Sequence, residues 1–495
     1  MPLVPHSNFK SMSSVNKSSQ PIPRTKTIHV ICIGGSGLRV LRSFLMLLSS
    51  GYDIPGYTVS PYIVDPHLQS NDLKFATELI TKYKKLHSND NKGFVQVPLL
   101  VDNLDNLNVM KVDSTLSQSF GDFIGYEKMT HQSDQHNMVD MLYNSININK
   151  SMNVGFKGSP NVGSVVFRDF INGKWFQDKF GNLTTNDKVI LIGSLFGGTG
   201  ASGIPAIARA LKEKSKNLEV AAIALTPYFK LSKPDSGATD KEIDSDIFNV
   251  KSLAALNYYN ESYLGIDNFY VVGDSLSKNY AYDEVNQGNE AHFIEMVAAT
   301  AVKHFATTSK SENEHWNMFF TDELQSTMLY NHCGEGLHDA LDCLANFYAF
   351  SKFFTMMQKD PFYPVNKKFY KVIKKGQREA DLFKALEDLI YSKDISMDSF
   401  VRWMGEMRDN TRSFNAVNTV DIKSPEGQIQ EYRFTPETSH VVFNGTEKLQ
   451  TINMSDYFLA INNKYRESLK TTDQISEVAK FLNIASSGIR EVNSK

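Results

Sequence analysis

The sequence predicts an α/β protein in which a doubly wound, mostly parallel sheet is followed by a smaller α+β C-terminal domain. Two observations support the sheet. Short β-branched runs, such as 28–33 and 188–193, recur along the first 305 residues. Glycine-rich turns and apolar residues at helical spacing alternate with these runs, as is typical of parallel sheets. Beyond residue 305 the pattern changes to an aromatic-rich helix and short alternating strands, which indicates a second domain.

The expected elements follow from local patterns. Apolar residues at helical spacing predict a helix from Leu38 to Leu48, and proline's preference for a first turn predicts another that starts near Ile204-Pro205. The other expected helices span 246–260, 289–305 and 344–357. The expected strands span 28–33, 62–64, 188–193, 219–225, 268–272, 430–434 and 440–443, the last two forming an antiparallel pair.

Composition indicates an ordinary globular protein. Of the 495 residues, 41% are hydrophobic and 22% are charged, and the formal net charge is -3. A surface that binds nucleic acid directly would show a basic excess, so that class is excluded. Residues 1–26 have no apolar run typical of a signal peptide and are expected to be a disordered tail. We expect no membrane span and, from three scattered cysteines, a reducing cytoplasmic setting.

The first glycine-rich turn, Gly34 to Gly37, lies between a strand and a helix. Glycines let backbone N–H groups approach phosphate oxygens, and a helix N-terminus adds partial positive charge. The turn also fits the start of a dinucleotide-binding fold with Asp65 on the ribose, although Val40 stands where a third glycine or alanine is expected. A Walker-type loop is excluded because no Gly-Lys-Ser/Thr is present in this turn.

A second turn, Gly197 to Gly203, reads Gly-Gly-Thr-Gly-Ala-Ser-Gly and also follows a buried strand. It resembles the signature of the tubulin/FtsZ superfamily, with one extra residue in Ala201-Ser202-Gly203 and Phe196 in place of a frequent leading glycine. A plain tight turn is the alternative interpretation. The resemblance covers about residues 27–305 and is closest to divergent bacterial tubulin-like proteins.

The order of the remaining loops is similar to that superfamily. Gly155 to Gly163 resembles the loop that senses the terminal phosphate, and Thr226 to Phe229 resembles the proline-containing loop after the next strand. The resemblance implies GTP as ligand, with ATP not excluded, and Mg²⁺ held on the phosphates rather than by a protein metal site. The implied nucleotide contacts are Gly34, Gly35, Ser36, Gly37, Asp65, Gly158, Ser159, Pro160, Gly197, Gly198, Thr199, Gly200, Ala201, Ser202, Pro227, Asn286 and Asn289.

Two assignments have alternatives. Asp339 and Asp342 resemble the acids that enter a neighbouring subunit's site to polarise water, but both also suit the first turn of a helix, where they would complement its dipole. Asn286 and Asn289 could bond a guanine edge, or Asn289 could cap its helix.

The resemblance divides the chain into the tail 1–26, a nucleotide-binding domain 27–310 and a C-terminal domain 311–495. It implies a filament of head-to-tail subunits in which GTP hydrolysis is an open possibility. The alternative is a non-polymerising switch or scaffold for a partner protein. A third hypothesis is that the chain is a dinucleotide-dependent enzyme.

Overall fold

Six strands form one parallel sheet in the order β2-β1-β3-β4-β6-β8. They are β1 (Lys26–Ile33), β2 (Tyr57–Val64), β3 (Asp187–Ser194), β4 (Glu219–Leu225), β6 (Asn268–Val272) and β8 (His315–Met318). The strands predicted at 28–33, 62–64, 188–193, 219–225 and 268–272 are all confirmed. Because every pair is parallel, the carboxyl ends of β1, β2 and β3 meet at one edge of the sheet.

The computed structural model describes only part of the chain. The described residues are 26–87, 93–101, 104, 107–110, 118–232, 245–261, 264–275, 278–281, 283, 287–308, 315–318, 327–328, 333, 335–359, 377–392, 398–414, 418–423, 429–435, 452–453, 463–464, 467, 482 and 485–486. The predicted disordered tail therefore lies outside the described residues, except that Lys26 already belongs to β1. No described helix is both long enough and apolar enough to cross a membrane.

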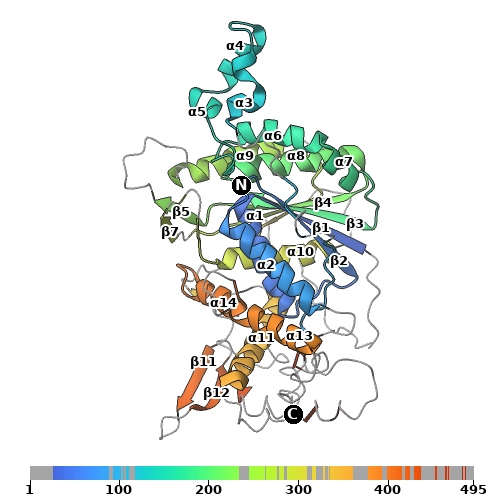
Figure 1. Cartoon of the computed structure of the whole chain (residues 1–495), viewed down its shortest axis with the longest axis vertical. Coiled ribbons are helices and arrows are strands. Elements are labelled where there is room, and N and C mark those ends of the chain that lie inside the picture. Colours follow the sequence, from blue (N-terminus) through green and yellow to red (C-terminus); the bar gives the residue numbers. More distant parts are fainter. Residues whose placement is uncertain are drawn as a thin grey trace, which may run out of the picture.

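Alternate residues of the central strand β1 enter two separate cores. Ile28, Val30 and Cys32 belong to one hydrophobic cluster, and Ile31 and Ile33 belong to the other. Helices therefore cover both faces of the sheet (Figure 1). On one face lie α1 (Gly34–Ser49), α2 (Asn71–Leu86) and α10 (Phe293–Thr307), and on the other lie α6 (Pro160–Asn172), α7 (Lys174–Phe180), α8 (Gly198–Lys214) and α9 (Phe248–Glu261).

A small helical projection extends beyond the layer of α6, α8 and α9, at the top of Figure 1. It contains α3 (Phe120–Ile124), η2 (Tyr126–Lys128), α4 (Asp134–Leu142) and α5 (Ser145–Ile148). Phe120 and Ile148 join the projection to the core beneath α6 and α8.

The C-terminal helices continue the core that contains α1 and α10. Phe347 and Phe350 of the predicted aromatic helix are buried there, and so is Trp403. The elements of this part are α11 (Glu335–Lys359), α13 (Gln377–Ile390), α14 (Phe400–Arg408), β11 (Asn418–Lys423), β12 (Ile429–Thr435) and β13 (Ile452–Asn453). The strand predicted at 430–434 lies within β12, and its antiparallel neighbours are β11 and β13, whereas 440–443 lies outside the described residues.

Short elements complete the description. Two-stranded parallel pairs are formed by β5 (Phe229–Ser232) with β7 (Lys278–Ala281), and by β9 (Thr327–Met328) with β10 (Ser413–Phe414). The turn η3 (Ser245–Ile247) precedes α9.

The start of α8 corrects a prediction. The helix begins at Gly198, and Pro205 lies inside it instead of in its first turn. Proline has no N–H, so the carbonyl of Ala201 loses its usual partner four residues later. The hydroxyl of Tyr259 donates to this carbonyl over 2.8 Å and replaces the missing hydrogen bond. Tyr259, on the neighbouring helix α9, therefore compensates for the hydrogen bond that Pro205 removes from α8.

We predict that Tyr259→Phe lowers the free energy of unfolding by about 1–3 kcal/mol, because it leaves the buried Ala201 carbonyl without a donor. In a Pro205→Ala background the restored N–H should supply that donor. Tyr259→Phe should then lower the free energy of unfolding clearly less than it does in the parent chain. Urea unfolding of the four chains measures the difference. Equal losses in both backgrounds would contradict this role for Tyr259.

Candidate functional site

A cavity lies at the carboxyl edge of the sheet, between the ends of β1 and β3 and the starts of α1 and α8. Its volume is about 230 Å³, and it is open to solvent on one side. Ten predicted nucleotide contacts line it: Gly34, Gly35, Ser36, Asp65, Gly158, Gly197, Gly198, Thr199, Gly200 and Asn289. The structure thus brings together residues that are separated by more than 250 positions in the sequence.

The remaining predicted contacts do not line this cavity. Gly37, Ala201 and Ser202 lie deeper in the helices, and the hydroxyl of Ser202 donates to the carbonyl of Gly198 within α8. Ser159, Pro160 and Pro227 are also absent from the lining, and Asn286 lies outside the described residues.

Two helix N-termini converge on the cavity. Gly34, with a φ of +70°, begins α1, and a Cβ at this position would lie 3.2 Å from the Cβ of Thr199 in the first turn of α8. Neither Ile33 nor Gly197, the N-cap residues, makes a side-chain capping hydrogen bond. The first N–H groups of both helices are therefore left for solvent or a ligand, and both helix dipoles favour an anion at this position.

The glycines of the two turns have different structural roles. A Cβ on Gly37 would lie 2.6 Å from the carbonyl oxygen of Ile192, and one on Gly200 would lie 2.6 Å from both the backbone N and O of Ser194. These two glycines are required for close packing of the helices on β3. Gly35 differs, because its nearest neighbour would be an Asp72 oxygen at 3.6 Å, an ordinary contact. Packing alone thus does not require glycine at position 35.

A third loop, residues 152–159, forms another wall. Gly155 and Gly158 have φ angles of +89° and +68°, and Lys157 adopts the same left-handed region with a φ of +41°. Phe156 is buried and anchors the loop, and Gly155, Phe156, Lys157 and Gly158 all line the cavity. The Nζ of Lys150 donates to the Ser159 hydroxyl over 2.7 Å. This hydrogen bond occupies the side chain of Ser159, a predicted nucleotide contact that does not line the cavity.

Two carboxylates lie on the wall next to α2. Burial raises the pKa of Asp65 to about 7, and its Oδ1 accepts the N–H of His67 over 2.9 Å. Burial also raises the pKa of Asp72 to about 6, with Glu295 adding repulsion and Arg39 opposing the rise. Asp72 was not predicted, because at the start of a helix an aspartate is usually read as a first-turn residue.

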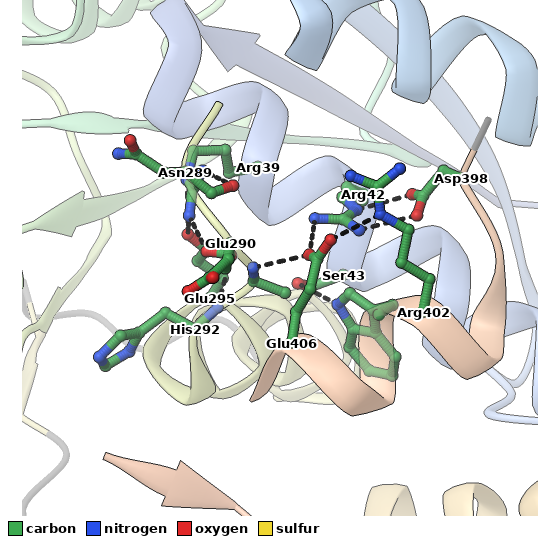
Figure 2. Close-up of polar contacts among 12 residues, drawn as sticks. Arg39, Arg42, Ser43, Asn289, Glu290, His292, Glu295, Asp398, Arg402 and Glu406 are labelled. Atoms are coloured by element: carbon green, nitrogen blue, oxygen red, sulfur yellow. Dashed lines mark hydrogen bonds and ion pairs between the residues drawn. The ribbon is translucent and has the colours of Figure 1, made fainter. Parts of the chain in front are cut away.

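Arg39 connects the cavity wall to the start of α10 (Figure 2). Its Nε donates to Glu295 Oε1 over 2.6 Å, and its two terminal nitrogens donate to the carbonyls of Asn289 (2.9 Å) and Glu290 (2.6 Å). Tyr228 donates to the same Glu295 oxygen over 2.9 Å. Burial opposes the charge of Arg39, but the carboxylate of Glu295 keeps its pKa above the ordinary value. In the sequence, Arg39 interrupts the apolar run 38–48, and a charged residue in a buried helix indicates a buried partner of opposite charge.

The start of α10 corrects the predicted helix boundary. The helix begins at Phe293, four residues later than expected, and its N-cap is His292 rather than Asn289. His292 Nδ1 accepts the N–H of Ile294 over 3.1 Å, and Glu295 accepts the N–H of His292 over 3.1 Å. Asn289 therefore does not cap this helix. Its Oδ1 accepts a hydrogen bond from Gln287 Nε2 over 2.7 Å, and both residues line the cavity.

The predicted catalytic acids lie away from this cavity. Asp339 and Asp342 belong to the first turns of α11, and Asp339 forms an ion pair with Lys303 near the end of α10. Lys303 is ten residues along α10 from Phe293, which corresponds to roughly 15 Å of helix. Neither acid lines the cavity of its own chain.

No protein-family model matches the chain, and no curated protein matches it. Solved structures that are similar include CetZ from Methanosaeta thermophila strain DSM 6194, with 14% identity, a TM-score of 0.28, and coverage of 50% of this chain and 46% of that one. CetZ2 from Haloferax volcanii, described as a GTPgS-bound protofilament, has 15% identity, a TM-score of 0.27 and coverage of 57% and 58%. The chain spans about half the length of each, and at these TM-scores the likeness supports no argument about function.

The raised pKa of Asp65 makes the stability of the ligand-free chain pH-dependent. The carboxyl group of Asp65 loses its proton at about pH 7 in the folded chain but near pH 3.8 in the unfolded chain. The free energy of unfolding therefore falls as the pH rises from about 4 to about 7. We predict that Asp65→Asn raises the melting temperature at pH 8, by an amount corresponding to a few kcal/mol at most, and that the gain vanishes near pH 4. Thermal scans of both chains, with exposed Asp178→Asn as control, test this. A gain that grows towards acid pH would contradict the assignment.

Proposed function

We propose that this chain is a GTP-binding protein with the doubly wound fold of the tubulin/FtsZ superfamily, and that it assembles head to tail into filaments. One structural observation is the main support for this proposal. Two helices without side-chain caps, α1 and α8, start at a single cavity beside the Gly155–Gly158 loop. Backbone N–H groups at both helix starts would bind the phosphates, and the loop would contact the terminal phosphate.

A divalent cation fits the acidic wall of the cavity. Asp65 and Asp72 are carboxylates in a site proposed to hold an anion, and their raised pKa values reflect the cost of burying these charges. Mg²⁺ would stabilise the ionised carboxylates directly or through its water. Within the described residues no three acidic, histidine or cysteine side chains cluster to hold a metal, so most ligands would be phosphate oxygens and water.

The base would lie beside Asn289. Asn289 Oδ1 accepts from Gln287, so the contact with the base would come from its Nδ2 group, which can only donate. A guanine presents two acceptors, O6 and N7, on one edge, whereas adenine presents an amino donor in the place of O6. This arrangement favours guanine. Asn286 remains a predicted second contact.

Hydrolysis would require assembly. Asp339 and Asp342 lie near the end of α10 that is remote from the cavity, so in a head-to-tail stack they would face the cavity of the next subunit. There a carboxylate would orient the water that attacks the terminal phosphoryl group, while N–H groups at the helix starts stabilise the developing charge.

A switch or scaffold that does not polymerise is the second candidate, and the ion pair between Asp339 and Lys303 favours it. A carboxylate that is already paired within its own chain is less able to act in a neighbour. This candidate predicts nucleotide binding without turnover or filaments.

The glycine at position 35 offers a direct test of nucleotide binding. We predict that Gly35→Ala folds normally, because its methyl group has room, but weakens GTP binding at least tenfold, about 1.4 kcal/mol, by blocking phosphate approach. Gly405→Ala, whose added Cβ meets nothing within 4 Å, is the matched control. Calorimetric titration with GTP, GDP and ATP in Mg²⁺ measures the affinities, and pelleting measures assembly. If neither GTP nor ATP binds the unmodified chain, or if both variants bind alike, the proposed site is wrong.

For the catalytic role, we predict that Asp339→Ala combined with Asp342→Ala lowers GTP turnover at least about 100-fold, since a lost acid or base group has effects of this size. GTP affinity should stay unchanged. Lys303→Met removes the same ion pair but keeps both carboxylates, so it should retain turnover. Phosphate-release assays under assembly conditions distinguish the two, and unchanged turnover in the double variant would exclude these acids.

A further inference from the structure

Helix α4, in the projection, exposes a continuous apolar stripe. Met138, Met141 and Leu142 are 57%, 87% and 61% exposed, and their spacing of three and four places them on one side of the helix. Ile146 of α5 extends the stripe. Met141 is thus almost fully in solvent, although Val139 of the same helix and Ile148 of α5 are anchored in the core.

A second stripe lies on α9. Val250, Leu253 and Tyr258 are 66%, 60% and 45% exposed. At about 100° of rotation per residue, all three lie on the half of α9 that faces away from the buried Phe248 and Tyr259. Ile247, in the preceding turn, is also exposed. The opposite side of α9 is buried through Phe248 and Tyr259.

The two stripes hold most of the exposed apolar surface. Of the eleven large hydrophobic residues that are exposed in the described part of the chain, eight belong to these stripes. Isolated exposed apolar residues are normal on a monomer, but large contiguous patches indicate contact surfaces.

Opposite charges border the two stripes. The projection, residues 119–149, contains Asp122, Glu127, Asp134 and Asp140 against a single lysine, Lys128, and Asp134 lies one turn before Met138 on the same side of α4. On the other stripe, the guanidinium of Arg209 lies 5.5 Å from the ring centre of Tyr258. An acidic apolar surface and an apolar surface with a cation at its border are therefore present on one chain.

We infer that these two surfaces bind each other between copies of this chain, with the α4 stripe of one copy packed on the α9 stripe of the next. Eight side chains that each expose on the order of 100 Å² would bury about 800 Å² of apolar surface, and their polar neighbours bring the total close to the ~1,000 Å² expected of a specific interface. Methionine side chains suit this contact because they adapt their shape to a partner. The contact does not depend on a bound nucleotide.

A membrane is the less favoured occupant. A lipid surface that is negatively charged would repel the four acids of the projection, whereas Arg209, at the Tyr258 end of the α9 stripe, would attract them. The preference for a second copy thus follows from charge as well as from apolar area.

Mixing of two variants tests the pairing. One variant carries Met138→Gln, Met141→Gln and Leu142→Gln, and the other carries Val250→Gln and Leu253→Gln. Because glutamine is a good helix former and these side chains are exposed, both variants should keep the parent melting temperature. Leu68→Gln with Leu100→Gln changes exposed apolar residues outside both stripes and is the control. Sedimentation velocity without nucleotide should show self-association of the parent and control, and at least tenfold weaker association of each stripe variant alone.

An equimolar mixture of the two stripe variants should form pairs again, because one copy retains an intact α9 and the other an intact α4. Chains with Met141→Cys and Leu253→Cys should form a disulfide in the mixture and much less in either sample alone, since Cys32, Cys333 and Cys343 are buried. A monomeric parent, association that persists in both stripe variants, or flotation of the parent with anionic vesicles would overturn the inference. These outcomes are independent of GTP binding, so they do not test the proposed nucleotide site.

Discussion

The buried ion pair between Arg39 and Glu295 is the contact on which the arrangement of the cavity depends. Arg39 lies one turn into α1, the helix that starts at the cavity, and Glu295 lies in the first turn of α10. The same guanidinium holds the carbonyls of Asn289 and Glu290, so the wall proposed to contact the base is fixed to the helix proposed to bind the phosphates. Breaking a buried pair leaves an uncompensated charge, which makes this geometry costly to change.

One turn further along α1, Arg42 connects the same helix to the C-terminal part of the chain. Its guanidinium bonds Asp398 over 2.6 and 2.7 Å and Glu406 over 2.8 Å, and Glu406 also accepts the N–H of Ala291 over 2.9 Å. Figure 2 shows both arginines projecting from α1 towards these partners. Successive arginines on a single helix therefore join the cavity, the start of α10 and the helix α14 through hydrogen-bonded charges. A rearrangement at the cavity would have to be transmitted through, or resisted by, this network.

Local sequence patterns predicted five of the six strands of the sheet and both glycine turns, because buried parallel strands and phosphate-type turns depend on neighbouring residues. They missed β8, which lies beyond residue 305, where the sequence pattern changes. They placed the starts of α8 and α10 wrongly, since Pro205 is tolerated through the distant Tyr259 and the α10 cap is shared between His292 and Glu295. The contacts of Arg39 and Asp72 depend on packing between segments far apart in the chain, and no local pattern shows them. The exposed stripes on α4 and α9 were also not predicted, because apolar residues at helical spacing are normally read as core. The acids Asp339 and Asp342 remain a hypothesis, since their role lies in an assembly rather than in one chain.

Hydrogen–deuterium exchange with and without GTP and Mg²⁺ tests the central claim most directly. We predict slower exchange of the backbone amides that begin α1 and α8, at residues 34–38 and 198–201, and of the loop 155–158. Amides of β11 and β12, which lie at the end of the molecule opposite the helical projection (Figure 1), should not change. GTP binding that protects other segments and leaves both helix starts unaffected, or no protection at any concentration, would contradict the account.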